Sequence, residues 1–259
     1  MIIRNNTDRE GIIESGRRLG VVLSEVAKAV VPGVSTATLD EIAERLIRED
    51  GDMPAFLDYT PERAARPYPA TLCVSVNDEV VHGIPNEAPR FLKAGDIVAL
   101  DLGLIHKGYV TDSAITVPVG KVSDEATRLM AVTKASLENA IAAARPGNRI
   151  GDISHATEKT FKGTGFSVVK VLGGHGVGAG VHEEPWIANV GTPGTGPEIV
   201  EGMVLALEPI ANAGKASVIL APDGYTYRSK DGSISAHFEH TILVEKNKTL
   251  VVSRRPGEE

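Results

Sequence analysis

The sequence has few of the features that mark several large classes of protein. Cysteine occurs once, at Cys73, in a chain of 259 residues, so no disulfide can form within the chain, which agrees with a reducing compartment. Aromatic residues make up only 4% of the chain, and nowhere do about 18 apolar residues run together as in a membrane span. The opening segment MIIRNNTDRE is charged and lacks the apolar stretch of a signal peptide. We therefore expect a cytoplasmic protein without a membrane segment.

An excess of basic residues is also absent. The formal net charge is −7 and no block of lysine and arginine occurs, so the chain lacks the electrostatic footprint of a nucleic-acid-binding protein. The hydrophobic fraction of 42% is ordinary for a globular chain with a sizeable core. Function must therefore be inferred from motifs.

The chain repeats one plan of secondary structure. An amphipathic pattern at residues 9–31 and 39–48 predicts two helices separated by Pro32-Gly33. The plan recurs 114 residues later, where matching positions are occupied by Pro146-Gly147, Ile153, Glu158 and Gly165. Strand-like segments follow each helix pair, and both contain His-x-x-Pro, at His82 and His182. We expect a single domain, 1–259, built from two pseudo-repeats at about 1–121 and 122–252.

Four acidic residues lie in predicted strands. GDIVALD ends at Asp101 and GMVLALE ends at Glu208, while GYVTDSA supplies Asp112 and SAHFEHT supplies Glu239. A buried carboxylate is costly unless a cation or donor compensates it, and four together cannot all stay ionised without cations. Halves related by a pseudo-two-fold axis would bring all four together, and His175 in GGHGVGAG is the obvious imidazole to join them.

This mixture of carboxylates with histidine suits a divalent ion such as Mn, Fe, Co or Zn, and four acids are enough to bridge two ions. Exposed or salt-bridged acids would explain any one of these residues, but not four on matched apolar strands. The glycine run at 173–180 is not expected to bind phosphate, because VHEEP follows it instead of an amphipathic helix. The glycines better fit a close approach of backbone to a crowded site. Cys73 is expected to be a small buried hydrophobe, not a nucleophile.

In the order and approximate spacing of its motifs, the chain resembles the type I methionine aminopeptidases of prokaryotic form, in metallopeptidase family M24. The motifs are VNDEVVHGIP, GDIVALDLG, GYVTDSA, GGHGVGAGVHEEP, GMVLALEP and SAHFEHT, and the resemblance extends from the first helix to about Val252. It implies the α+β pita-bread fold, in which two pseudo-two-fold-related halves form antiparallel sheet covered by helices. It also implies metal-dependent hydrolytic removal of the N-terminal initiator methionine from nascent proteins and peptides with a small second residue.

The resemblance also implies the roles of individual residues. Two divalent metal ions (Co, Mn, Fe or Zn) would be held by Asp101, Asp112, His175, Glu208 and Glu239. Asp112 and Glu239 would bridge the ions, Asp101 would complete one of them, and His175 with Glu208 the other. Glu208 would also move a proton, and His82 and His182 would be the catalytic histidines that face substrate. The methionine pocket would be lined by His82, His182, Cys73, Tyr59, Tyr68, Val181 and Tyr225.

The chain departs from the family pattern at two places. Where bacterial members tend to have Tyr-His-Gly-Tyr/Phe-Pro, this chain has the extra segment 60–67 between Tyr59 and Tyr68, and Val181 stands where phenylalanine is frequent. We expect segment 60–67 to be an exposed loop, either at the rim of the entrance or as a neutral surface insertion.

Two other functions remain open from the sequence. An Xaa-Pro peptidase similar to aminopeptidase P or prolidase would use the same ligands, although such chains usually carry a further N-terminal domain. A non-catalytic pita-bread binding protein would be expected to have lost some ligands. For the main interpretation, the expected partners are nascent polypeptide N-termini, and the ribosome is one place where the enzyme would meet them. No nucleic-acid partner and no membrane are expected. The chain is expected to be a monomer.

Overall fold

The structure is a computed structural model that describes residues 1–61 and 64–258. The described chain contains four α-helices: α1 (Asn6–Lys28), α2 (Thr36–Glu49), α3 (Asp124–Ala143) and α4 (Ile150–Thr160). The two helices predicted at 9–31 and 39–48 are therefore confirmed. Side chains at the helix starts satisfy free N–H groups, because Ser35 and Ser123 accept from Ala37 and Ala126. No helix among the described residues is long and apolar enough to cross a membrane.

The described strands form four sheets, and within each sheet neighbouring strands pair in antiparallel orientation. The first sheet contains β1 (Met53–Pro54), β2 (Leu72–Val76), β4 (Ile97–His106) and β5 (Tyr109–Pro118). The largest contains β7 (Gly173–Gly176), β8 (Glu183–Ala188), β9 (Val204–Leu207), β14 (His240–Val244) and β15 (Thr249–Val251). Two smaller sheets comprise β6 (Ser167–Val168), β10 (Ile210–Asn212) and β13 (Ser235–His237), and β3 (Glu79–Val81), β11 (Val218–Leu220) and β12 (Tyr227–Ser229).

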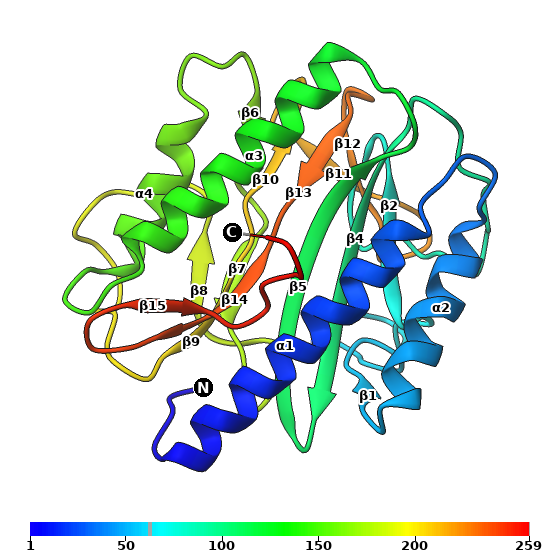
Figure 1. Cartoon of the computed structure of the whole chain (residues 1–259). Coiled ribbons are helices and arrows are strands. Elements are labelled where there is room, and N and C mark those ends of the chain that lie inside the picture. The colour runs from blue at the N-terminus through cyan, green and yellow to red at the C-terminus, as the bar shows by residue number, and fades with distance from the viewer. Residues whose placement is uncertain (62–63, 259) are drawn as a thin grey trace.

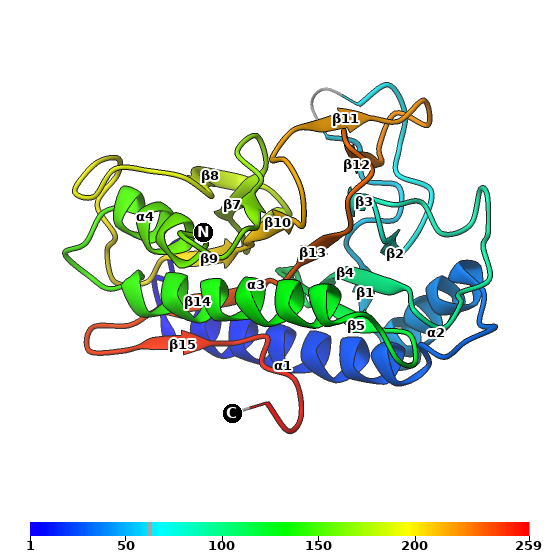
Figure 2. The same cartoon turned by 90° about the horizontal axis from the view of Figure 1, so that it is seen from above.

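The long helices cover one side of the strands. α1 packs on β4 and β5, while α3 packs on α4 and on β9, β10 and β13. Figure 1 shows α1 and α3 across the front of the sheets, and Figure 2 shows both along one side of them. The apolar layers between helices and strands include Leu19 and Leu100 in one cluster and Leu129 and Leu205 in another. This is the predicted α+β arrangement of antiparallel sheet covered by helices.

The same order of elements occurs in both parts of the chain. A helix pair precedes the β4–β5 hairpin, and a second helix pair precedes β9 and β14, which also pair with each other. The strand beside β4 is β2, and the strand beside β9 is β7. Two pseudo-repeats stay a prediction, with which this order of elements is compatible.

A backbone seam joins the two large sheets. The N–H of Glu239 donates to the carbonyl of Ala114 at 2.9 Å, and the N–H of Ala114 donates to the carbonyl of Glu239 at 3.3 Å. The Thr241 hydroxyl donates to the carbonyl of Asp112 at 2.7 Å and accepts from the Asp112 N–H at 2.9 Å. Asp112 on β5 and Glu239 beside β14 are thus held next to each other by main-chain bonds that do not involve their carboxylates.

Glycines allow β7 to fit between its neighbours. A Cβ placed on Gly174 would overlap the carbonyl oxygen of Ala206 on β9, and one on Gly176 would overlap the carbonyl oxygen of Glu184 on β8. Only a residue without a side chain permits these backbones to approach so closely. The expectation that the glycine run serves close backbone packing is therefore supported on both sides of His175.

We predict that Gly174→Ala destabilises the protein by roughly 1–3 kcal/mol, because the added methyl group forces β7 away from β9. The control is Gly180→Ala, where a Cβ would meet nothing closer than the Glu183 side chain at 3.9 Å. Urea unfolding of both variants measures the difference. Equal stability of the two variants would show that the close approach at Gly174 is not required.

Candidate metal centre

The first two acids project from the β4–β5 hairpin. Asp101 lies on β4 opposite Cys73 on β2, and Asp112 lies on β5 opposite Gly103. Side chains alternate along a strand, so Asp101 and the position of Gly103 share one face, and Asp112 lies diagonally across from Asp101. The register therefore brings both carboxylates and the Cys73 thiol to the same face of the sheet.

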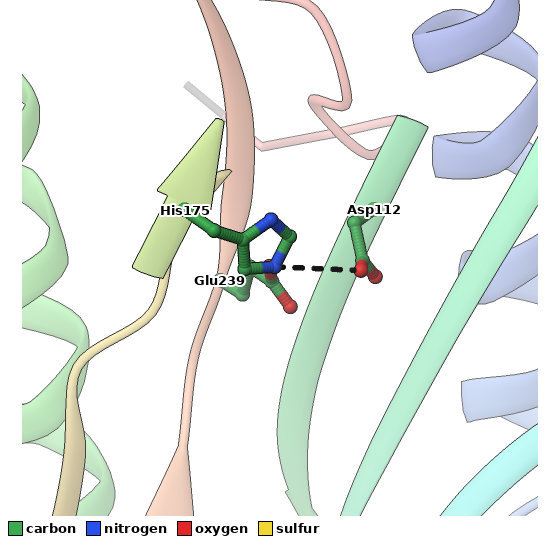
Figure 3. Close-up of side chains that lie close together, drawn as sticks. All are labelled: Asp112, His175 and Glu239. Atoms are coloured by element: carbon green, nitrogen blue, oxygen red, sulfur yellow. Dashed lines mark ion pairs between the residues drawn. The ribbon is translucent and has the colours of Figure 1, made fainter. Parts of the chain in front are cut away.

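The remaining candidates come from the second half of the chain. His175 lies on β7 opposite Ala206, Glu208 follows the end of β9, and Glu239 lies between β13 and β14. Figure 3 shows the side chains of Asp112, His175 and Glu239 pointing toward one another from separate segments of the chain. One potential ligand atom from each of these three residues lies within 4.8 Å of the other two.

These side chains are buried and incompletely hydrogen-bonded. Asp101, Asp112, His175 and Glu239 are at most 7% exposed. Among the described residues, most of the buried polar side-chain atoms without a hydrogen-bond partner belong to this centre: Asp101 Oδ1, Asp112 Oδ1, Glu239 Oε1 and both ring nitrogens of His237. Such atoms are rare in folded proteins unless something else binds them, so the donor set fits a metal ion.

The pKa values of the four acids are raised because these side chains are buried close to one another. Burial raises the pKa of Asp101 to about 7, and burial together with neighbouring carboxylates raises the pKa values of Asp112, Glu208 and Glu239 well above their ordinary values. Without a cation, each ionised carboxylate makes the next one harder to ionise. The cluster therefore requires bound protons or bound metal ions near neutral pH.

The contacts of the His175 ring suit an imidazole that binds a metal ion. Its Nδ1 lies 2.9 Å from the Gly176 carbonyl oxygen, which can only accept, so Nδ1 carries the proton. Burial lowers the pKa of His175 to about 3, which keeps the ring neutral and leaves a lone pair on Nε2. Nε2 faces two further acceptors, Glu208 Oε1 at 3.5 Å and Asp112 Oδ2 at 4.0 Å, the latter contact drawn in Figure 3. A positive ion between them would turn this repulsion into ligation.

A cavity of about 540 Å³, part of it open to solvent, lies beside the acids. The residues that line it are Phe56, Tyr59, Pro61, Tyr68, Cys73, His82, Asp101, Asp112, His175, His182, Glu208, Tyr225 and Glu239. The structure thus brings together all but one of the site residues predicted from the sequence. Val181 is buried in the adjoining apolar cluster but is not among the lining residues. Phe56 and Pro61 were not predicted, because no motif marks them.

The two predicted substrate-facing histidines reach the cavity in different ways. His82 follows β3 and has a positive φ of 58°, a conformation that non-glycine residues seldom adopt. The His182 ring packs edge-on against His175, with centroids 4.5 Å apart, and its Nδ1 lies 3.0 Å from the Tyr59 hydroxyl. Burial lowers the pKa of both histidines, to about 4 for His82. Both rings are therefore neutral near pH 7.

The extra segment 60–67 lies beside the cavity, although Glu62 and Arg63 fall outside the described residues. Pro61 lines the cavity, and Arg66 forms a bidentate ion pair with Glu87 and donates to the Asp223 carbonyl at 3.2 Å. The Tyr225 hydroxyl donates to the Arg66 carbonyl. The described part of the segment is thus attached to the loop that carries Tyr225, which supports the rim interpretation.

Comparison with known proteins agrees with this geometry. Residues 10–246 match the sequence family described as metallopeptidase family M24. The chain is 43% identical over 255 residues to methionine aminopeptidase 1 of Bacillus subtilis, covering 98% of this chain and all of that protein. The crystal structure of a methionine aminopeptidase from Thermotoga maritima superposes with a TM-score of 0.93 at 39% identity, covering 98% of this chain and 100% of the other. These matches confirm the predicted pita-bread fold.

The fold also occurs in peptidases with another specificity. An Xaa-Pro dipeptidase from Bacillus anthracis has a TM-score of 0.76 at 21% identity, and the match covers 98% of this chain but 62% of that one. At this identity the likeness shows the fold alone.

Removal of metal ions should make the stability of the protein depend on pH in a defined direction. Because the folded-state pKa values of the acids are raised, the metal-free folded protein binds protons that the unfolded chain releases. Its stability should fall as pH rises from 3.8, the ordinary aspartate value, through about 7, the value for Asp101. Mn²⁺ should stabilise the protein increasingly over this range, because metal and protons compete for the same ligands.

Melting temperatures measured across this pH range, with EDTA and with Mn²⁺, test the prediction. Asp101→Asn is the control, since loss of this titrating group should make the pH dependence of the metal-free protein shallower. A metal-free wild type and an Asp101→Asn variant with the same pH dependence would contradict the assignment.

Proposed function

The chain belongs to metallopeptidase family M24, and on this premise we propose that it is a methionine aminopeptidase. It removes the initiator methionine from the N-terminus of nascent proteins and peptides with a small second residue. The observation that carries the proposal is the Nε2 lone pair of His175, which faces two carboxylates in a buried cluster of four acids beside an aromatic cavity. Such a site can bind metal ions and an apolar side chain together.

Two divalent ions would occupy the centre, with Mn, Fe, Co and Zn all compatible with the ligands. Asp112 and Glu239 would bridge them, Asp101 would complete one ion, and His175 with Glu208 the other. This assignment is supported by the main-chain seam that holds Asp112 and Glu239 adjacent. When bound, the ions would act as Lewis acids that make water nucleophilic near neutral pH and polarise the peptide carbonyl.

The protein's own residues would move protons and stabilise charge. Glu208, whose pKa is raised by burial, would take the proton of the attacking water and pass it to the leaving amine. If the Tyr59 hydroxyl donates to Nδ1 of His182, the neutral ring carries its proton on Nε2. His182 could then donate to the carbonyl oxygen as negative charge develops there, and His82 would contact the peptide near its scissile nitrogen.

The cavity would bind the methionine side chain. Cys73 and the rings of Phe56, Tyr68 and Tyr225 provide apolar and aromatic surface, and a thioether makes favourable contacts with ring edges. Burial raises the pKa of Cys73 well above its ordinary value, so the thiol stays neutral and presents no charge to the ligand. These properties support an unbranched, apolar first residue as substrate.

The biological setting follows from this substrate. Nascent chains with an initiator methionine arise in the cytoplasm, so we infer that the enzyme works there, as a monomer and with the ribosome as a place of encounter. The negative net charge supports the absence of a nucleic-acid partner. The catalytic unit would be the single domain of two pseudo-repeats predicted from the sequence.

The substrate assignment predicts a clear order of peptide hydrolysis. With Mn²⁺, Met-Ala-Ser should be cleaved with a kcat/KM at least about 100-fold above that for Met-Leu-Ser, because a site shaped for a small second residue excludes a bulky one. Ala-Pro-Ser, the test substrate for an Xaa-Pro peptidase, should be cleaved no faster than Met-Leu-Ser. Preferential cleavage of Ala-Pro-Ser would replace the proposal with the Xaa-Pro alternative, and no metal-dependent turnover of any peptide would favour a binding protein.

His182→Ala should lower kcat by about 100- to 1,000-fold while changing KM little, because the donor is needed mainly in the transition state. His155→Ala, at a histidine on α4 that lines a different pocket, controls for loss of an imidazole and should leave kcat unchanged. Steady-state kinetics on Met-Ala-Ser separates the two parameters. An effect of His182→Ala on KM alone would assign His182 to ground-state binding.

A further inference from the structure

His237 is a buried histidine whose environment differs from that of the other buried histidines. It is the last residue of β13 and is 1% exposed, and neither of its ring nitrogens has a hydrogen-bond partner in the part of the chain that the structure describes. Among the described residues, the remaining buried histidines each bond through Nδ1: His106 to Asp52, His175 to Gly176 and His240 to Ser253. An unsatisfied buried imidazole is costly, so its retention here calls for a ligand or a function.

The ring of His237 lies among the acids of the metal centre. Its Nε2 is 3.6 Å from Glu208 Oε2 and 3.8 Å from Glu239 Oε2. The other oxygen of Glu208 lies 3.5 Å from His175 Nε2. Glu208 is therefore flanked by two imidazoles, one on each carboxylate oxygen.

Main-chain pairing holds His237 in this place. It is opposite Ile210 in the β10–β13 ladder, so its strand runs beside the segment that carries Glu208. Its N–H donates to the Thr116 hydroxyl at 2.8 Å, and its carbonyl accepts from the same hydroxyl at 2.8 Å. The backbone of His237 is thus fixed to β10 on one side and β5 on the other, and its ring faces Glu208 at a defined position.

We propose that His237 is a positioning residue of the metal centre, whose Nε2–H donates to Glu208 Oε2 and keeps Oε1 directed toward the metal ions. The inference rests on the proposed function. A shift of a few tenths of an ångström converts the 3.6 Å separation into a hydrogen bond, since such bonds extend to about 3.2 Å. The partners that hydrogen-bond to metal-ligating carboxylates fix their orientation and typically contribute about 10- to 100-fold to metal affinity.

The two histidines beside Glu208 would then perform opposite tasks. His175 gives its Nδ1 proton to a carbonyl and presents a lone pair to the metal position. No acceptor competes for the His237 proton at Nδ1 among the described residues, whereas two carboxylate oxygens lie near Nε2. The Nε2–H tautomer is therefore the one that satisfies His237 and Glu208 together.

The test compares Mn²⁺ affinity of the full-length, EDTA-stripped protein and its variants by calorimetric titration. His237→Leu removes the donor and should weaken Mn²⁺ binding about 10- to 100-fold, while His237→Gln retains an N–H donor and should recover most of the loss. His106→Gln, at a buried histidine bonded to Asp52, should leave the affinity unchanged. Mn²⁺ affinity of His237→Leu within about twofold of wild type, or His237→Gln as weak as His237→Leu, would overturn the inference.

A measurement on the wild type avoids dependence on the folding of a variant. In the Zn²⁺-loaded protein, the ¹⁵N resonances of His237 should show a protonated Nε2 and an unprotonated Nδ1. Either a protonated Nδ1 or a metal-bound Nε2 would overturn the role of His237 as a donor to Glu208.

Hydrolysis of Met-Ala-Ser separates the two levels of the proposal. A wild type that neither binds Mn²⁺ nor cleaves the peptide would overturn the proposed function and, with it, the inference. A wild type that does both, with an unaffected His237→Leu variant, would overturn the inference alone.

Discussion

The mutual repulsion of four buried carboxylates is the constraint on which the structure depends. Asp101 and Asp112 lie on neighbouring strands, Glu208 and Glu239 lie beside strands of the second half, and all four meet at one place, where burial raises the pKa of each. Such a cluster opposes folding unless the remaining contacts hold it together or cations neutralise it. Metal binding and folding are therefore linked, because ions that stabilise this cluster also stabilise the arrangement of strands around it.

Hydrogen bonds to the main chain hold Asp112 and Glu239 in place. Ser113 and Thr241 hydroxyls bond to the carbonyls of Glu239 and Asp112, and Arg255 donates to Ser113 and to the Ala114 carbonyl from the C-terminal segment. Among the described residues, Asp101 Oδ1, Asp112 Oδ1 and Glu239 Oε1 have no hydrogen-bond partner. These oxygens are available to a metal ion, while main-chain hydrogen bonds fix the positions of the residues that carry them.

Asp101 and Glu208 could be predicted from the sequence because each stands six residues after a glycine in an apolar segment, and Asp112 and Glu239 because each lies in a second β-rich segment of its half. His82, His175 and His182 were found through motifs of the same kind. Phe56 and Pro61 could not be found, since they come from short irregular segments that reach the cavity only through tertiary packing. His237 carried a signal that was missed: it precedes Glu239 by two residues, and the period of a strand puts both side chains on one face. Val181 packs in the same apolar cluster as Cys73, Tyr68 and Tyr225 but does not line the cavity.

The three histidines at this centre differ in the groups that lie beside their ring nitrogens, and these neighbours determine what each ring can do. His175 and His237 are buried and His182 is more exposed, and desolvation favours the neutral form of each ring. A carbonyl beside Nδ1 leaves His175 with a lone pair on Nε2, whereas Nδ1 of His182 lies beside the Tyr59 hydroxyl. The absence of a described partner at Nδ1 of His237, with carboxylates near Nε2, favours donation to a ligand instead. One neutral side chain can thus bind metal, stabilise charge or orient a carboxylate, because the second nitrogen of each ring has a different neighbour.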